Sequence, residues 1–358
     1  MCGSVCREGQ NEMKRLFSLA AGLLLLSALL AGCERRRELY TTQFVTLFDT
    51  VVTVRAYAGS RQAFDEWADD LYAELEEYHR LFDVYHEYEG MNNLCTVNRL
   101  GAAAPVEVDG RILDLLELGK AIGEQTGGKL NIAMGAALSL WSEYRAQGMA
   151  DPASAALPPA GELREAMAHA DPADIQIDRG ASTVFLADSL LRIDVGAVGK
   201  GYAVEQAAQR MEERAEKYDV DGALINAGGN IRTIGVRGDG TPWEVGVQDP
   251  ADADRLLLKV GLSGSRTLVT SGDYQRYYTV DGIRYAHIID PGTGMPPRHM
   301  AAVSVLCGDS ARADALSTAL FCMTVEEGRA LVESLPDTEA VWVAGDGAVT
   351  YSSGFEAH

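Results

Sequence analysis

The chain has 358 residues, of which 52 are acidic and 31 are basic, so its formal net charge is −21. This balance argues against nucleic acids and anionic lipid surfaces as partners, because both repel an acidic protein. The length is enough for one large domain or two intimately packed domains with a sizeable core.

The N-terminal 32 residues predict a secretory signal peptide. A basic segment that begins at Met13, the expected true start, is followed by an apolar run over residues 16–31, which is typical of a signal and short for a membrane span. The run ends in Leu-Ala-Gly-Cys at residues 30–33, similar to a bacterial lipobox. We therefore expect lipidation of Cys33 and a lipid-anchored location on the extracytoplasmic face of the cell membrane. A signal peptide or anchor helix with a coincidental cysteine is the alternative.

The cysteines that remain after Cys33 do not form a framework. Cys95, Cys307 and Cys322 are an odd number without a C-x-x-C pair, so we predict neither a disulfide scaffold nor a structural zinc site. Cys307 and Cys322 lie in apolar surroundings, which predicts small core residues.

We expect a tether over residues 33–42 and a single domain over residues 43–358. Hydrophobic periodicity predicts, in chain order, a strand over residues 41–58, helices over residues 61–83 and 112–125, a surface loop over residues 148–161, a hairpin over residues 182–195 and a helix over residues 200–217.

Strands dominate from residue 222 onward. They are expected over residues 222–226, 242–248, 256–262, 276–280, 283–289 and 301–307. Asp281 and Gly282 predict a two-residue hairpin turn, and a helix over residues 309–323 is followed by a capping box from Thr324 to Glu327. Strands grouped between helices indicate an α+β fold rather than regular βαβ alternation.

The stretch Ile-Asp-Val-Gly-Ala-Val-Gly-Lys-Gly at residues 193–201 predicts a strand that enters a helix through a glycine-rich turn. Its glycines let backbone groups approach a ligand, and Lys200 at the helix N-terminus adds a cation suited to phosphate. The spacing matches neither the Walker A nor the dinucleotide-binding motif, so a structural turn with a solvated lysine is an equal alternative.

Two further polar, glycine-rich segments lie in the strand-rich part of the chain. They read Asn-Ala-Gly-Gly-Asn at residues 226–230 and Thr-Ser-Gly-Asp-Tyr-Gln-Arg at residues 270–276. Each alone could be turn chemistry, but their density within one predicted sheet indicates a site.

The C-terminal third carries the clearest chemistry. His287 lies on a predicted strand that ends in a Pro/Gly turn, while Asp314 and Thr318 lie one helical turn apart on one face. Two oxygen ligands suit Mg²⁺, and a histidine can act as a base, so the set suggests Mg²⁺-assisted chemistry on a phosphate ester. A satisfied polar histidine and a helix with one buried polar face are the alternatives.

Taken in order, these segments resemble the ApbE family of bacterial FAD:protein FMN transferases. The resemblance covers nearly all of the mature chain from Phe48 onward, and its specific segments are residues 126–128, 194–201, 226–230, 270–276, 287–296 and 314–318. It implies an antiparallel-rich sheet core with packed helices and an FAD site between two intimately packed parts. It also implies Mg²⁺-dependent transfer of FMN from FAD to a Thr or Ser hydroxyl of a target flavoprotein, with release of AMP.

The resemblance implies roles for particular residues. Mg²⁺ would lie between Asp314, Thr318 and the carbonyl of Ala197, and His287 would be the base. FAD would contact Phe48, Tyr85, Asp194, Lys200, Ile288 and the backbone at Thr126, Gly127 and Gly128. The acceptor would be a subunit of a membrane redox complex outside the cytoplasm.

The chain departs from the family pattern at two places. Phe48 stands where methionine is usual, and Asn131-Ile132 replaces Asp-Pro; a phenylalanine ring can still stack on a flavin. Around Tyr85, residues 82–98 also depart from the usual serine-rich pattern. A Mg²⁺-dependent FAD pyrophosphatase and a lipid-anchored FAD-binding protein without chemistry are the alternative functions.

Overall fold

The computed structural model describes residues 37–355, and those from Leu39 onward form one compact unit. The predicted signal peptide and Cys33 lie outside the described residues. No helix within residues 37–355 is long and apolar enough to cross a membrane.

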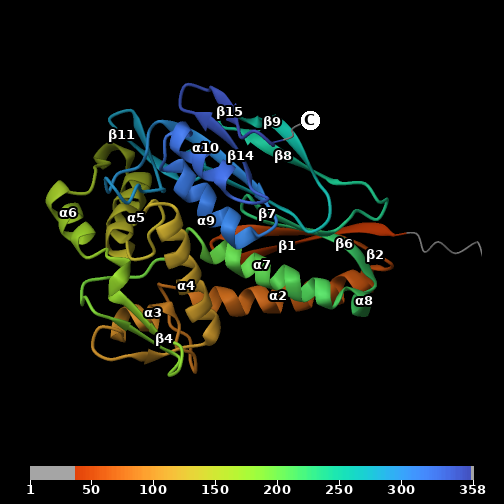
Figure 1. The fold of residues 1–358 in the computed structure, drawn as a ribbon, viewed down its shortest axis with the longest axis horizontal. Coiled ribbons are helices and arrows are strands. Elements are labelled where there is room, and N and C mark those ends of the chain that lie inside the picture. Colours follow the sequence, from red (N-terminus) through yellow and green to blue (C-terminus); the bar gives the residue numbers. More distant parts are fainter. Residues whose placement is uncertain (1–36, 356–358) are drawn as a thin grey trace, which may run out of the picture. The chain divides into compact units, whose positions relative to one another are not determined.

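The centre of the unit is an eight-stranded sheet with the order β1-β2-β6-β7-β10-β13-β14-β15 (Figure 1). From β2 to β15, neighbouring strands pair antiparallel. The strands are β1 (Glu38–Leu47), β2 (Thr50–Ala58), β6 (Val220–Ala227), β7 (Asn230–Gly235), β10 (Thr267–Gly272), β13 (Met300–Cys307), β14 (Glu339–Ala344) and β15 (Val349–Tyr351).

Helices α2 (Arg61–Phe82), α7 (Gly199–Glu213) and α9 (Ser310–Phe321) pack against this sheet. Figure 1 shows α2 and α7 side by side, and both α2 with α7 and α7 with α9 are in contact. Helix α9 also lies on β10 and β13 and is buried on nearly all sides, because its alanines let neighbouring backbones approach closely. This layer forms the main hydrophobic core.

A ribbon of two strands, β8 (Trp243–Asp249) and β9 (Asp252–Leu262), forms a second hydrophobic cluster with the sheet. Its apolar side chains alternate along both strands and pack with Leu224, Leu268 and Val341 of the sheet.

A third cluster joins helices α5 (Gly135–Ala150) and α6 (Ala160–Ala168) to the hairpin of β11 (Tyr277–Val280) and β12 (Ile283–Ala286). Trp141 is at its centre and donates a hydrogen bond to the carbonyl of Gly294 at 2.9 Å. Ile288 belongs to the main core and Ile289 to this third cluster. The segment that follows β12 therefore runs along the junction of two packed parts.

The remaining elements complete the unit. They are α3 (Leu94–Leu100), β3 (Val106–Glu107), α4 (Gly110–Gln125), η1 (Pro152–Ser154), η2 (Pro172–Asp174), β4 (Ile175–Asp178), β5 (Thr183–Leu186), α8 (Ala215–Tyr218) and α10 (Val325–Ser334). Strands β3, β5 and β4 form a small sheet in that order.

The α+β prediction is confirmed, as are several local ones. The turn at Asp281 and Gly282 has φ values of 51° and 78° and joins β11 to β12. Thr324 caps α10 with the predicted reciprocal capping box. Cys307 and Cys322 are buried, as expected of core residues.

Other predictions were wrong. Residues 41–58 form two strands, because Phe48 and Asp49 adopt φ values of 53° and 51° and turn the chain between β1 and β2. Residues 182–195 are no hairpin, since β5 pairs with β3 and β4 instead. In the polar segment 270–276, the turn interpretation is right for residues 273–276 and wrong for residues 270–272, which complete β10 inside the sheet. The predicted strand 283–289 ends at Ala286.

Candidate active site

Helices α7 and α9 meet at their N-terminal halves through Asp314. The Gly201 amide donates to Asp314 Oδ2 at 2.7 Å, and Lys200 Nζ donates to Asp314 Oδ1 at 3.0 Å. A Cβ atom at residue 201 would lie 2.4 Å from Asp314 Cβ and 2.5 Å from the Ser310 carbonyl oxygen. The last glycine of the predicted loop is therefore required by close helix packing.

A buried ion pair fixes the same two helices one turn further along. Glu205 of α7 accepts two hydrogen bonds from the Arg232 guanidinium, both at 2.9 Å, and a third from the Ser310 amide at 2.7 Å. Both side chains are at most 3% exposed. Burial acts to raise the pKa of Glu205, but Arg232 and the other donors outweigh it and the net shift is downward. The Asp314 carboxylate is thus presented by a rigid frame.

Hydroxyl groups gather beside Asp314. Ser317 Oγ donates to the Asp314 carbonyl at 2.9 Å, and Ser271 Oγ lies 2.8 Å from Ser317 Oγ and 3.4 Å from Thr318 Oγ1. Thr318 is half-buried, whereas Asp314 is only 6% exposed, so the Asp314 side chain lies deeper in the protein than that of Thr318.

Asp314, Thr318 and Ala197 offer oxygen atoms of the kind that bind a hard cation. A carboxylate has about four lone-pair positions, and Lys200 and Gly201 occupy two of those on Asp314. The Thr318 hydroxyl and the Ala197 carbonyl, two residues before the start of α7, are oxygens of the kind Mg²⁺ prefers. Residues 37–355 hold no group of three or more His, Cys, Asp or Glu side chains that could bind a metal ion, so a cation here would depend on hydroxyl and carbonyl oxygens in addition to Asp314.

His287 follows β12 at the junction of the two packed parts. Its amide donates to the Arg276 carbonyl at 3.0 Å, and its Nδ1 lies 3.3 Å from the same oxygen. Burial, together with the positive charges of Arg276 and Arg145, lowers the pKa of His287 to about 4. The imidazole is therefore neutral at neutral pH, and a proton on Nδ1 shared with the carbonyl leaves Nε2 free to accept another.

The β1–β2 turn reaches this segment. Arg276 Nη2 donates to the Asp49 carbonyl at 2.6 Å. The Phe48 ring meets His79 edge-on with centroids 5.5 Å apart, and the Phe48 amide donates to His79 Nδ1 at 3.3 Å. Phe48 is thereby held at the tip of the hairpin, half-buried.

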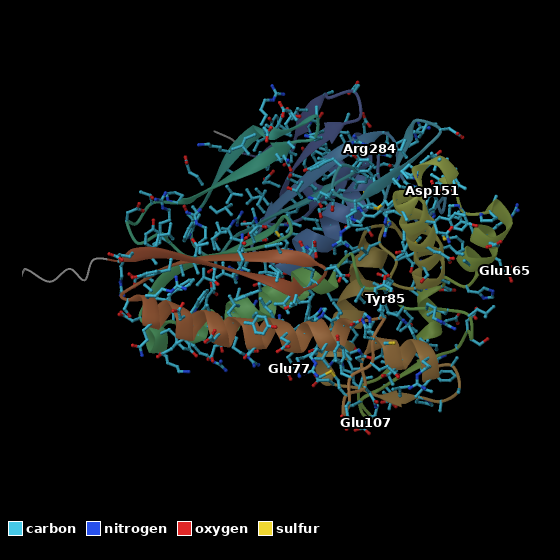
Figure 2. The ribbon with its side chains drawn as sticks, turned by 180° about the vertical axis from the view of Figure 1, so that it is seen from behind. Glu77, Tyr85, Glu107, Asp151, Glu165 and Arg284 are labelled. Carbon is cyan, nitrogen blue, oxygen red and sulfur yellow. The ribbon has the colours of Figure 1, made fainter. Side chains whose placement is uncertain are left out.

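Tyr85 and Asp194 line one cavity of about 430 Å³, together with Asn98, Ser139 and Arg192. Tyr85, labelled in Figure 2, follows the C-terminal end of α2 and is 63% exposed. Burial raises the pKa of Asp194, opposed by a 2.8 Å hydrogen bond from the Gly196 amide. The structure thus brings these two predicted FAD contacts together.

The turn after α4 lies near the segment that follows His287. The Thr126 hydroxyl is buried and donates to the Ile122 carbonyl at 2.8 Å, so only backbone atoms of this turn can meet a ligand. Gly127 and Gly128 have φ values of 61° and 83° and are exposed. Lys129 Nζ pairs with Asp290 Oδ1 at 3.0 Å, which connects the turn to the segment containing Ile288, whose side chain is buried.

Sequence reasoning missed three polar groups of this region. Ser271 was treated as part of a turn, and Ser317 was passed over between Asp314 and Thr318. Arg145 was missed because α5 was not predicted. No local pattern marks Arg145, since its importance comes from contacts across the fold.

The fold and these groups define an α+β protein whose site combines oxygen donors, cations and a neutral histidine, a set suited to phosphate chemistry. The family model described as "ApbE family" matches residues 48–342. An FAD:protein FMN transferase of Treponema pallidum is 32% identical over 341 residues, covering 90% of this chain and 89% of the relative. One from Klebsiella pneumoniae is 30% identical, covering 76% and 84%.

Solved structures agree with this. The ApbE protein of Thermotoga maritima superposes with a TM-score of 0.75 at 28% identity, covering 88% of this chain and 97% of its own. The flavinyl transferase ApbE of Pseudomonas stutzeri gives a TM-score of 0.71 at 25% identity, covering 89% and 95%. The chain belongs to the ApbE family.

Proposed function

We propose that this protein transfers FMN from FAD to a Thr or Ser hydroxyl of a flavoprotein and releases AMP. The observation that carries the proposal is the geometry around Asp314, whose carboxylate contacts Lys200 Nζ at 3.0 Å and the Gly201 amide at 2.7 Å. The neutral His287 imidazole adds a base. The FAD:protein FMN transferases that resemble it along most of their length support the same activity.

The chemistry balances with the groups present. The acceptor oxygen attacks the phosphorus on the FMN side and forms a new P–O bond, while the P–O bond to AMP breaks and AMP leaves with the electron pair. His287 Nε2 accepts the hydroxyl proton. The low pKa of His287 keeps the imidazole unprotonated, so it is able to act as a base. Lys200 offsets negative charge that builds during the transfer.

Asp314, Thr318 and the Ala197 carbonyl would hold Mg²⁺. When bound, the ion would neutralise pyrophosphate charge. Asp314 also holds Lys200 and the start of α7 in position, so its carboxylate has a structural role beside any metal role.

The FAD contacts follow the cavity and the turns around it. Tyr85 and Asp194 line the cavity, and Phe48 is presented by the β1–β2 turn. Lys200, Ile288 and the backbone at Thr126, Gly127 and Gly128 complete the proposed set. The last three offer backbone groups only, because the Thr126 hydroxyl is occupied within α4.

The cellular setting is also a proposal. The lipobox-like sequence supports lipidation of Cys33 and anchoring on the extracytoplasmic face of the membrane. A subunit of a membrane redox complex with an exposed Thr or Ser would be the acceptor.

Mass spectrometry tests the activity. The protein is incubated with FAD, Mg²⁺ and a threonine-containing acceptor protein, with and without a chelator. An FMN adduct on one Thr or Ser with AMP release, both lost on chelation, is the expected result. AMP and free FMN without an adduct would favour the pyrophosphatase, and intact bound FAD would favour the carrier.

A further inference from the structure

Two arginines beside His287 lack an acidic partner. Within residues 37–355, no carboxylate lies within 4.0 Å of the Arg145 or Arg276 guanidinium. Arg145 Nη2 donates to Ser142 Oγ at 3.2 Å, and Arg276 Nη2 donates to the Asp49 carbonyl at 2.6 Å. The buried Arg232 and the half-buried Arg111, by contrast, are paired with carboxylates at 2.7 to 2.9 Å.

Arg145 and Arg276 come from two elements that pack together next to His287. Helix α5, which carries Arg145, packs on β11, where the Tyr278 ring fills the space at Gly148. Arg276 precedes β11 and its carbonyl accepts from His287. The positive charges of Arg276, Arg145 and Lys200 all act on His287. The nearby Arg284, labelled in Figure 2, is already paired with Asp273 at 3.2 Å.

This arrangement is costly without an anion. Arg145 is half-buried, and burial followed by repulsion from Arg276 lowers the pKa of its guanidinium, with only Tyr85 and Tyr278 acting in the opposite sense. A partly desolvated cation next to a like charge is unfavourable unless a negative group completes the site. The planar donors of arginine match phosphate oxygens in particular.

We propose that Arg145 and Arg276 form a phosphate-binding site beside His287, which a phosphate group of the dinucleotide substrate occupies. The inference rests on the proposed function for the identity of that substrate. It gives Arg145 a role in substrate binding that is separate from the Asp314 cluster.

The site also couples binding to base strength. A bound phosphate offsets the charges of Arg145 and Arg276, which favours the protonated imidazole and raises the pKa of His287 from its low value. The base therefore becomes stronger when substrate is present and stays neutral when it is absent.

Binding of ADP and of adenosine to the full chain, measured calorimetrically without metal, tests the proposal. Arg145→Gln should weaken ADP binding by about tenfold or more, since a charged hydrogen bond contributes about 1.5–3 kcal/mol, and should leave adenosine binding unchanged. Arg145→Lys should fall between, because lysine keeps the charge without the planar donors. Arg164→Gln, an exposed arginine of α6, is the matched control and should match the wild type.

Three outcomes would overturn the proposal. Two come from calorimetry: unchanged ADP affinity in Arg145→Gln, or an equal loss of ADP and adenosine affinity. The third comes from the kinetics of transfer: a defect of Arg145→Gln confined to the Michaelis constant for the acceptor protein would show that the arginines bind a carboxylate of the acceptor. Failure of the proposed function has a different signature. The wild type would then form no FMN adduct, while ADP binding could still depend on Arg145.

Discussion

The Asp314 cluster and the His287 segment lie in one protein but are built in opposite ways. Asp314 is 6% exposed, and both its carboxylate oxygens have partners from α7, which is itself fixed to α9 through Glu205. His287 follows a hairpin, and within residues 37–355 neither Arg145 nor Arg276 beside it has a carboxylate within 4.0 Å. The first region is held in place by contacts within the protein, whereas the second has two arginines that we propose a substrate phosphate neutralises.

The largest effect is expected from Asp314→Asn. Asparagine keeps an oxygen that can accept from the Gly201 amide but loses the charge that pairs with Lys200 and suits a cation. We expect kcat/KM for transfer to fall by about 10³-fold, a loss at the upper end of those seen when an electrostatic group is removed. Steady-state kinetics checks this, with Asp69→Asn on the exposed face of α2 as the control. Near-normal kinetics would mean that the carboxylate is only structural.

The next effect is expected from His287→Gln, because a general base acts in the transition state. A loss of about 10²-fold in kcat with little change in FAD affinity is predicted. His169→Gln serves as the control, because His169 is a partly exposed histidine that pairs with Asp188 at 2.6 Å. Loss of FAD binding in His287→Gln would instead make His287 a binding residue.

A smaller effect, on stability, is expected from Gly201→Ala. The new methyl group would lie 2.4 Å from Asp314 Cβ, so α7 and α9 must separate. We expect the free energy of unfolding to fall by about 1–3 kcal/mol, as for other overpacked sites. Chemical denaturation measures this, and Gly110→Ala, where a Cβ meets nothing within 4 Å, is the control. Equal stability of the two variants would contradict the rigid packing of this cluster.

The smallest effect is predicted for pH. A base must be unprotonated, so activity is lost as pH falls through its pKa, and His287 with a pKa of about 4 in the free protein should hold kcat/KM flat from about pH 8 to pH 5.5. Arg145→Gln removes a neighbouring positive charge and should move the acid limb to higher pH. A wild-type limb near pH 6.5 that depends on His287 would show that its environment is not cationic.

The Asp314 cluster could be predicted from the sequence better than the His287 segment. Asp314 and Thr318 could be placed on one face because helical spacing is a local property. The glycine-rich segment before α7 indicated that its backbone comes close to another group. The contact of Gly201 with Asp314 could not be predicted, because the two residues are more than a hundred positions apart and meet only when α7 and α9 pack together in the fold.

The His287 region depends more on tertiary contacts. Residues 270–276 have turn-forming composition, yet pairing with β13 draws Thr270 and Ser271 into the sheet. The downward shift in the pKa of His287 comes first from burial, then from Arg276 and from Arg145 on an unpredicted helix, and a single strand reveals none of these. The β1–β2 turn could not be predicted because Phe48, a bulky residue, is unusual at positive φ.

The most direct test of the division between the two regions is to measure FAD binding, AMP release and FMN adduct formation together in the wild type, Asp314→Asn and His287→Gln. We expect Asp314→Asn to lose both AMP release and adduct formation, and His287→Gln to bind FAD as the wild type does but to form the adduct slowly. Adduct formation by Asp314→Asn at the wild-type rate, or a collapse of FAD affinity in His287→Gln, would contradict this expectation.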